Sequence, residues 1–144
     1  MDQVTVVAAD WEKDSDELVK LRTRVFVGEQ NVPASLEMDG RDTECAHVKA
    51  LIDDVIIGTG RLLPDGFIGR MCVLKEYRNR GIGAMMLKNL LQQAVDNGHR
   101  KVSLNSQSAV ISFYEKFGFI IDSEEFIEAG IPHQRMVLYL NSET

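Results

Sequence analysis

A short apolar strand, a glycine turn and an amphipathic helix follow one another in the middle of this sequence, and this run constrains the fold most. The strand is predicted over residues 67–74, Gly81 and Gly83 lie in the turn, and apolar residues then recur at three- and four-residue spacing until Gly98 ends the helix after Val95. Glycines lack a Cβ, and the first N–H groups of a helix have no internal partners. The helix dipole adds partial positive charge there, so the run predicts an anion site suited to a pyrophosphate.

Three phosphate-binding motifs compete for this glycine pair. A dinucleotide-binding G-x-G-x-x-G would need a third glycine where Met86 stands, and the Gly-Lys-Ser/Thr of a P-loop does not follow. The third motif, R-x-x-G-x-G, is complete as Arg78, Gly81 and Gly83. An ordinary strand–turn–helix with glycines at a tight bend is the alternative interpretation.

The length and charge of the chain limit the classes of function. At 144 residues the chain fits one domain with a sizeable core, so we expect a single domain over residues 1–144. A net charge of −6 argues against nucleic-acid binding and mildly favours a cationic acceptor. No apolar stretch approaches the roughly 18 residues of a membrane span, and the N-terminus lacks a signal-peptide pattern, so a cytoplasmic protein without membrane binding is expected.

The two cysteines do not predict a disulfide or a metal site. Cys45 and Cys72 are too few for a disulfide framework and form no C-x-x-C, which indicates reduced, buried thiols. Cys45 and His47 alone are too small a cluster for zinc, and no other ligand set stands out, so no metal is expected.

Hydrophobic patterns predict the order β, α, loop, three β, α, β, α, two β. The expected strands cover residues 4–8, 46–52, 55–62, 67–74, 101–104, 119–126 and 134–140, and the helices about 15–28, 82–95 and 108–117. Asp14 and Glu17 form a capping box for the first helix, Asp53-Asp54 a hairpin turn, and Ser108 a cap for the last helix. The irregular stretch 29–42 is long enough to line a binding site. This order favours a mixed α/β architecture, a sheet with helices on both faces.

A downstream segment supports the R-x-x-G-x-G interpretation. The stretch 113–119, Phe-Tyr-Glu-Lys-Phe-Gly-Phe, follows the expected fifth strand, and with the glycine motif it closely resembles the GCN5-related N-acetyltransferase (GNAT) family. The resemblance covers nearly the whole chain, and the stretches 26–33 and 130–133 resemble the small bacterial ElaA-like branch. It implies the acyl-CoA N-acyltransferase fold, whose mostly antiparallel central sheet splays at the cofactor site, and acetyl-CoA as co-substrate.

The resemblance also implies a set of cofactor contacts. The pantetheine arm would bind the main chain of Met71, Cys72 and Val73. The pyrophosphate would contact Arg78, Asn79, Arg80, Gly81, Ile82 and Gly83. Gln107 stands where relatives often have an asparagine, so nearby Asn105 is the expected substitute contact.

The implied mechanism is direct attack of an amine on the thioester. Tyr114 falls on the position of the general acid that protonates the leaving thiolate, with a core aromatic as the alternative. A backbone N–H near Val73 is expected to polarise the thioester carbonyl. Some relatives carry a glutamate as base early in the central strand, where this chain has Phe67.

The general base is therefore open among Glu29, His47 and His133. His133 is preferred, because a group that titrates near neutral pH in a loop by the acceptor suits proton transfer. Each candidate also has a purely structural alternative: Glu29 is solvated at a helix end, His47 is hydrogen-bonded within the sheet, and His133 braces the turn at Pro132.

The sequence thus predicts an enzyme that moves an acetyl group from acetyl-CoA to an amine of a small molecule, with Tyr114, His133 and Glu29 as candidate catalytic residues. A non-catalytic acyl-CoA sensor is the alternative, motivated by the missing strand glutamate, and an adaptor domain without affinity for CoA is a third interpretation. A homodimer is a further prediction, since strand edges of the C-terminal sheet often pair in this family. The identity of the acceptor is not encoded by any motif.

Overall fold

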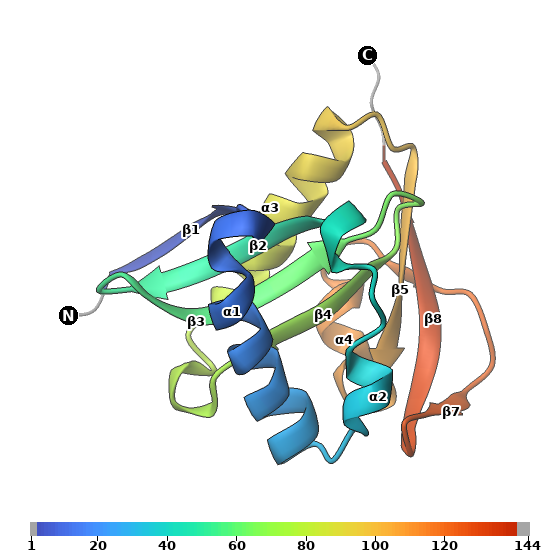
Figure 1. Ribbon diagram of the computed structural model, residues 1–144. Helices are drawn as coiled ribbons and strands as arrows, with labels where there is room; N and C mark the ends of the chain where they lie inside the picture. The colour runs from blue at the N-terminus through green and yellow to red at the C-terminus, as the bar shows by residue number, and fades with distance from the viewer. Residues whose placement is uncertain (1–2, 141–144) are drawn as a thin grey trace.

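A computed structural model describes residues 3–140 (Figure 1). The single-domain prediction for residues 1–144 includes 1–2 and 141–144, which lie outside the described part. The strands are β1 (Val4–Ala9), β2 (Ala46–Ile52), β3 (Val55–Leu62), β4 (Ile68–Val73), β5 (Lys101–Gln107), β6 (Ile120–Ile121), β7 (Phe126–Glu128) and β8 (Ile131–Tyr139). The helices are α1 (Trp11–Arg22), the π-helix η1 (Thr23–Glu29), α2 (Ala34–Glu37), α3 (Ile82–Asp96) and α4 (Ile111–Glu115), with short 3₁₀ turns η2 (Asp42–Glu44), η3 (Lys75–Tyr77) and η4 (Ser108–Val110).

The strands form two sheets. The first is an antiparallel meander in the order β1-β2-β3-β4, and the second has the order β5-β8-β6, with β7 also paired to β8. The predicted Asp53-Asp54 turn joins β2 to β3, and both residues have positive φ (52° and 65°), as a two-residue hairpin turn of the I′ type requires. Figure 1 shows α1 and α3 on opposite faces of the first sheet, which confirms the mixed α/β architecture with helices on both faces, although the strand pairs of both sheets are antiparallel.

The long helix α3 packs its apolar stripe on the sheet as its spacing predicts. Its buried residues are Ile82, Met86, Leu87, Leu90 and Ala94. Two glycines of β3 allow this close packing, because a Cβ on Gly58 would lie 3.0 Å from Met86 Sδ and one on Gly60 3.1 Å from Leu90 Cδ1. On the other face, α1 and η1 bury Leu18, Leu21 and Val25.

The strands β4 and β5 meet at one end only. The Ser103 N–H donates to Gly66 O (3.0 Å), and Phe67 and Ser103 form an isolated parallel bridge. Beyond this point β4 and β5 belong to different sheets, and Figure 1 shows them running apart. The splay expected from the family resemblance is therefore a feature of this chain.

Two predicted helix starts are wrong. The first helix begins at Trp11, because the Asp10 carboxylate caps it by accepting from the Glu12 N–H (3.1 Å). Asp14 lies inside the helix, where its carboxylate accepts from the Asp10 N–H (3.0 Å) and from Lys49 (2.9 Å). Ser108 does not cap α4, since its hydroxyl donates to Glu125 (2.8 Å).

The predicted strands 119–126 and 134–140 also differ from the structure. The first is divided into β6 and β7, because the Ser123 hydroxyl accepts the Arg135 N–H and so takes the place of a strand partner. The last strand begins earlier, at Ile131, so most of the predicted loop 127–133 is a β7–β8 hairpin turning at Ala129 and Gly130. Pro132 is tolerated there because it is the second residue of β8 and lies beyond the end of the β5–β8 ladder at the Gln107–His133 pair.

Candidate active site

The edge of β4 that faces away from β3 carries main-chain groups without a strand partner. Within residues 3–140, β4 pairs with β3 alone apart from the contact at Phe67, so it is the edge of its sheet. The Leu74 N–H donates to Ile57 O on the β3 side (2.9 Å), and strand alternation therefore directs the N–H and C=O of Val73 to the open edge. The side chains of Met71 and Val73 pack on the α3 side, and Cys72 is buried on the α1 side, where burial raises the pKa of its thiol to about 12. By the same alternation the main-chain groups of Cys72 point to Thr59 of β3, so Val73 is the one of these pantetheine candidates shown to present its main chain at the open edge.

Arg78 and Glu29 lie at the end of this edge. Arg78 Nε donates to Val73 O (2.9 Å), and the two terminal nitrogens of Arg78 lie 2.6 and 2.7 Å from the Glu29 carboxylate oxygens. The hydrogen bonds from Arg78 lower the pKa of Glu29, which makes this carboxylate a weaker base. The structure thus brings together three predicted site residues, with the Arg78 guanidinium on Glu29 and Val73.

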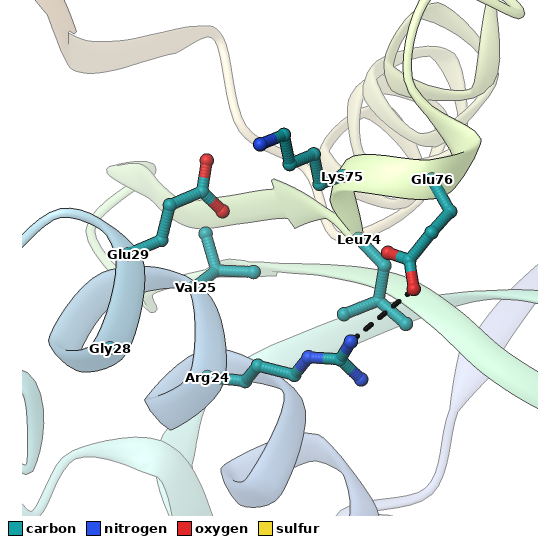
Figure 2. A pocket seen from close by; sticks show the side chains of 7 residues that line it. All are labelled: Arg24, Val25, Gly28, Glu29, Leu74, Lys75 and Glu76. Carbon is teal, nitrogen blue, oxygen red and sulfur yellow. Dashed lines mark hydrogen bonds and ion pairs between the residues drawn. The ribbon is translucent and has the colours of Figure 1, made fainter.

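A hollow lies beside this pair, between η1 and the turn after β4. Its volume is about 740 Å³, and its lining residues are Arg24, Val25, Gly28, Glu29, Leu74, Lys75 and Glu76. Figure 2 shows the η1 residues on one side and the residues that follow β4 on the other, with an ion pair between Arg24 and Glu76 (3.3 Å). Charged side chains of both signs therefore surround an apolar floor.

The turn between β4 and α3 has the conformation that its glycines predict. Asn79 and Gly81 have positive φ (65° and 78°), and a Cβ on Gly81 would meet no atom within 4 Å. The first helical hydrogen bond of α3 runs from Met85 N to Gly81 O, so the N–H groups of residues 82–84 precede it at the positive end of the helix dipole. Arg80 lies over the Tyr77 ring (5.4 Å). The backbone can therefore be approached closely by a phosphate group.

Tyr114 lies on α4, beside the start of α3. Its ring packs edge-on against Phe113 and Phe119, with distances of 4.9 and 5.9 Å between ring centroids. A Cβ on Gly83 would lie 3.6 Å from Phe113 Cζ. Burial raises the pKa of Tyr114 to about 12, so its hydroxyl stays protonated at neutral pH. Transfer of that proton to a thiolate of pKa about 8.5 is uphill by roughly 5 kcal/mol before any substrate contact changes either group.

His133 and Asn105 meet at a third residue, Glu128. His133 Nδ1 donates to Ile131 O (2.7 Å), because a carbonyl can only accept, so Nε2 carries the lone pair of the neutral ring. This Nε2 lies 3.9 Å from Glu128 Oε2, and Asn105 Nδ2 donates to Glu128 Oε1 (3.1 Å). His133 was expected in a loop, but it lies in β8. Its hydrogen bond to Ile131 O bridges Pro132, which agrees with the alternative that His133 braces the turn at Pro132.

The two faces of the β5–β8 ladder separate these candidates. Tyr114 packs on the core that contains Leu104 and Met136, whereas Asn105 and the Gln107–His133 pair alternate to the opposite face. On that opposite face Gln107 Nε2 donates to Gln30 Oε1 (3.1 Å), which links β5 to the segment after η1. Tyr114 and the preferred base His133 thus lie on different sides of the sheet, and the predicted cofactor contact Asn105 lies on the His133 side.

His47, the remaining candidate base, has the purely structural role that was its alternative. Its ring stacks on Trp11 (4.7 Å), and Nε2 donates to Asp42 O (2.9 Å). Burial lowers its pKa, although the contact with Asp42 opposes this.

A buried ionic network on the α1 side was not predicted from the sequence. It consists of alternating guanidinium and carboxylate groups from Arg22, Glu37, Asp39, Asp42, Arg61 and Arg70. Arg22 binds Asp42 with two hydrogen bonds (2.7 and 2.8 Å) and Glu37 through Nε (2.7 Å). Arg61 joins Asp42 (2.9 Å) to Asp39. One signal was available, since Arg61 and Arg70 stand inside otherwise apolar strands, where a charge is found only with a partner.

Within residues 3–140, no group of three or more His, Cys, Asp or Glu side chains is placed to hold a metal ion. In the same range, every helix is too short or too polar to cross a membrane.

Comparison with known proteins places these features in context. Residues 11–140 match a family model described as an acetyltransferase (GNAT) domain. The uncharacterized N-acetyltransferase YjcF of Bacillus subtilis (strain 168) is 37% identical over 135 residues, which cover 91% of this chain and 96% of YjcF.

Two solved structures have nearly the same fold. An acyl-CoA N-acyltransferase from Pseudomonas aeruginosa has a TM-score of 0.84 at 29% identity, and the match covers 94% of this chain and 99% of that one. Escherichia coli ElaA has a TM-score of 0.84 at 27% identity, with 92% and 98% covered.

Proposed function

The chain belongs to the acetyltransferase (GNAT) family, and from this premise we propose that it transfers an acetyl group from acetyl-CoA to an amine of a small molecule by direct attack on the thioester. The resemblance to the ElaA-like branch is confirmed. Membership supports an acyltransferase that uses an acyl-CoA; the acetyl group and the amine acceptor are our proposal.

The observation that carries the proposal is the open edge of β4 beside the glycine turn. An extended pantetheine arm needs main-chain donors and acceptors, and Val73 offers its N–H and the second lone pair of its C=O, which also accepts from Arg78 Nε. A pyrophosphate needs backbone N–H groups that can be approached closely, which the turn at Gly81 supplies. The residues present therefore fit acetyl-CoA along β4 and the start of α3.

We assign the general base to His133. A primary amine of lysine type is protonated about a thousandfold near neutral pH, which costs roughly 4 kcal/mol before it can attack. His133 Nε2 has a lone pair, and Glu128 at 3.9 Å would stabilise the imidazolium that forms when a proton is taken up. Glu29 is the weaker candidate, because its hydrogen bonds with Arg78 lower its pKa.

Tyr114 remains the proposed general acid. Its position on the other face of the β5–β8 ladder suits a reaction in which the amine approaches from the His133 side and the thiolate departs on the α4 side. Because the pKa of Tyr114 is about 12, protonation of the thiolate would require the developing charge to lie within hydrogen-bond distance of the hydroxyl.

Release of the CoA thiol in the presence of a panel of primary amines tests the proposal, with the mass of the acetylated amine as confirmation. We expect turnover that depends on the amine, and a loss of at least tenfold in kcat for Tyr114→Phe with unchanged affinity for acetyl-CoA. Binding of acetyl-CoA without turnover by any amine would favour the sensor alternative.

The homodimer stays a prediction, which light scattering at micromolar concentration tests.

A further inference from the structure

Arg70 has a backbone conformation that is unusual inside a strand. Its φ is +54°, a region that side chains other than glycine seldom adopt. The β3–β4 register shifts at the same place: Arg61 pairs with Gly69 and Thr59 with Cys72, so Arg70 and Met71 together face Gly60. This is a β-bulge, with the residue of positive φ at its first position.

A bulge of this kind is usually built with glycine, so a side chain at this position needs compensating contacts. The Arg70 guanidinium makes several, and all reach one short segment. Nη2 donates to Leu36 O and Glu37 O (both 3.0 Å) and lies 3.4 Å from Asp39 Oδ2, and Nε lies 3.3 Å from Glu37 Oε2. Arg70 therefore joins the bulge of β4 to residues 36–39.

Residues 36–39 are themselves anchored by the rest of the ionic network. The Glu37 side chain is 1% exposed and also contacts Arg22, and Asp39 contacts Arg61. Leu36 and Met38, which alternate with these two acids, are exposed. The segment is thus anchored by its two acidic side chains, while its two apolar side chains are exposed.

The bulge also stands at the start of the strand edge to which the pantetheine contacts are assigned. Met71 is its second residue, and the open edge at Val73 follows two residues later. The segment 36–39 lies in the stretch 29–42 that we expect to line the acceptor site. Arg70 joins the two elements directly, whereas the contact of Asp39 with Arg61 reaches β4 only through β3.

We propose that Arg70 is a positioning residue that couples the acceptor-side segment 36–39 to the cofactor-binding edge of β4, an inference that rests on the proposed function for the identity of the two sites. Acetyl-CoA bound along β4 would fix the bulge and, through Arg70, reduce the motion of segment 36–39. The coupling prepares the acceptor site when the acetyl donor is bound.

Three variants separate the effect of the positive φ at residue 70 from the effect of the guanidinium contacts. Arg70→Gly removes every guanidinium contact and suits the positive φ, so the bulge is retained. Arg70→Ala removes the same contacts and keeps the unfavourable Cβ. Arg70→Lys keeps the charge but cannot contact two carbonyls and a carboxylate with one planar group.

Amide hydrogen exchange of the full chain, with and without acetyl-CoA, is the test. Without ligand, we expect exchange in residues 34–42 to rise at least tenfold in Arg70→Gly and Arg70→Ala, less in Arg70→Lys, and not at all in α3. With saturating acetyl-CoA, we expect the wild type to gain at least threefold protection in residues 34–42, and Arg70→Gly to gain none although it still binds the ligand.

Two results would overturn the inference: unchanged exchange of residues 34–42 in Arg70→Gly without ligand, or equal protection by acetyl-CoA in that variant and the wild type. Absence of acetyl-CoA binding by the wild type would instead refute the proposed function. The ligand-free comparison would still decide whether Arg70 holds the segment, so the two failures are distinguishable.

Discussion

The turn at residues 78–83 and the segment 36–42 both flank β4, and they are held in place by different interactions. The turn depends on its own backbone, with positive φ at Asn79 and Gly81, and its ion pair with Glu29 is about one-third exposed. The segment depends on buried charges from α1, β3 and β4, which are distant in the sequence. The comparison teaches that the turn is held mainly by its local backbone conformation, whereas the segment is held by buried charges from several elements.

Loss of Asp42 should show this contrast most strongly. Asp42 accepts hydrogen bonds from Arg22 and Arg61 and is buried, so Asp42→Asn removes one of the two carboxylate partners of each guanidinium group. We expect a loss of about 3–5 kcal/mol in the free energy of unfolding, measured by urea denaturation. The matched control is Glu44→Gln, which removes an exposed ion pair with Arg41 and should leave stability unchanged within error. Equal effects of the two variants would contradict the account.

The same network should make stability depend on pH in the acid range. Hydrogen bonds from Arg61 hold the pKa of Asp39 well below its usual value. Burial acts to raise the pKa of Asp42, but the hydrogen bonds and charges of Arg22 and Arg61 outweigh burial and lower it. Because both pKa values are lower in the folded state, their contribution is present above the unfolded value near 3.8 and is lost as the pH falls below it.

Urea denaturation between pH 7 and pH 3 measures this dependence. The free energy of unfolding should fall below about pH 4, and the fall should be smaller in Asp39→Asn, which lacks one of the two titrating groups. The same slope in both proteins would show that Asp39 is not stabilised as an anion.

In the turn before α3, substitution of the two glycines by alanine should change stability in opposite directions. Gly81→Ala places a Cβ in a left-handed conformation and should cost about 1 kcal/mol, although no atom obstructs it. Gly83→Ala adds a Cβ at an ordinary contact distance within the first turn of α3 and should stabilise by up to about 1 kcal/mol. Thermal denaturation of both variants measures the pair, and destabilisation by both would show that the turn is held by packing and not by backbone conformation.

The smallest effect on stability is expected at Glu29. Its ion pair with Arg78 is exposed enough that Glu29→Gln should change the free energy of unfolding by less than about 1 kcal/mol. Removal of this competing carboxylate should strengthen acetyl-CoA binding by a few fold, if Arg78 must leave Glu29 to reach the pyrophosphate. Glu76→Gln is the control, because it breaks a similar exposed pair with Arg24. Weaker binding in Glu29→Gln alone would show that the Arg78–Glu29 pair is part of the bound state.

Two parts of the fold that depend on local sequence were predicted correctly, although the helix starts at Asp14 and Ser108 were not. The spacing of Ile82, Met86 and Leu90 fixes the buried face of α3, and Asp53-Asp54 fixes the β2–β3 hairpin, because each signal lies within a few residues. The division of the expected strand 119–126 was not predictable in this way. It depends on the Ser123 hydroxyl meeting the Arg135 N–H, a contact between residues that only the sheet brings together.

The candidate site follows the same division. The glycine turn could be identified from its motif, whereas the network around Arg22 joins it to Asp42, 20 residues away in the sequence. The partner of His133 was missed because Glu128 stands across a hairpin that was expected to be a loop. Arginines inside apolar strands were the one local sign of the network, and a charge alone does not name its partner.

Calorimetric titration of acetyl-CoA into the wild type, Gly83→Asp and Gly83→Asn tests the central claim, that the turn and the open edge of β4 form the binding site of the acetyl donor. Asp and Asn have nearly the same shape, so their difference isolates the effect of a negative charge beside the pyrophosphate position. We predict micromolar binding by the wild type, retained binding by Gly83→Asn and none by a folded Gly83→Asp. No binding by the wild type, or equal binding by the two variants, would contradict the account.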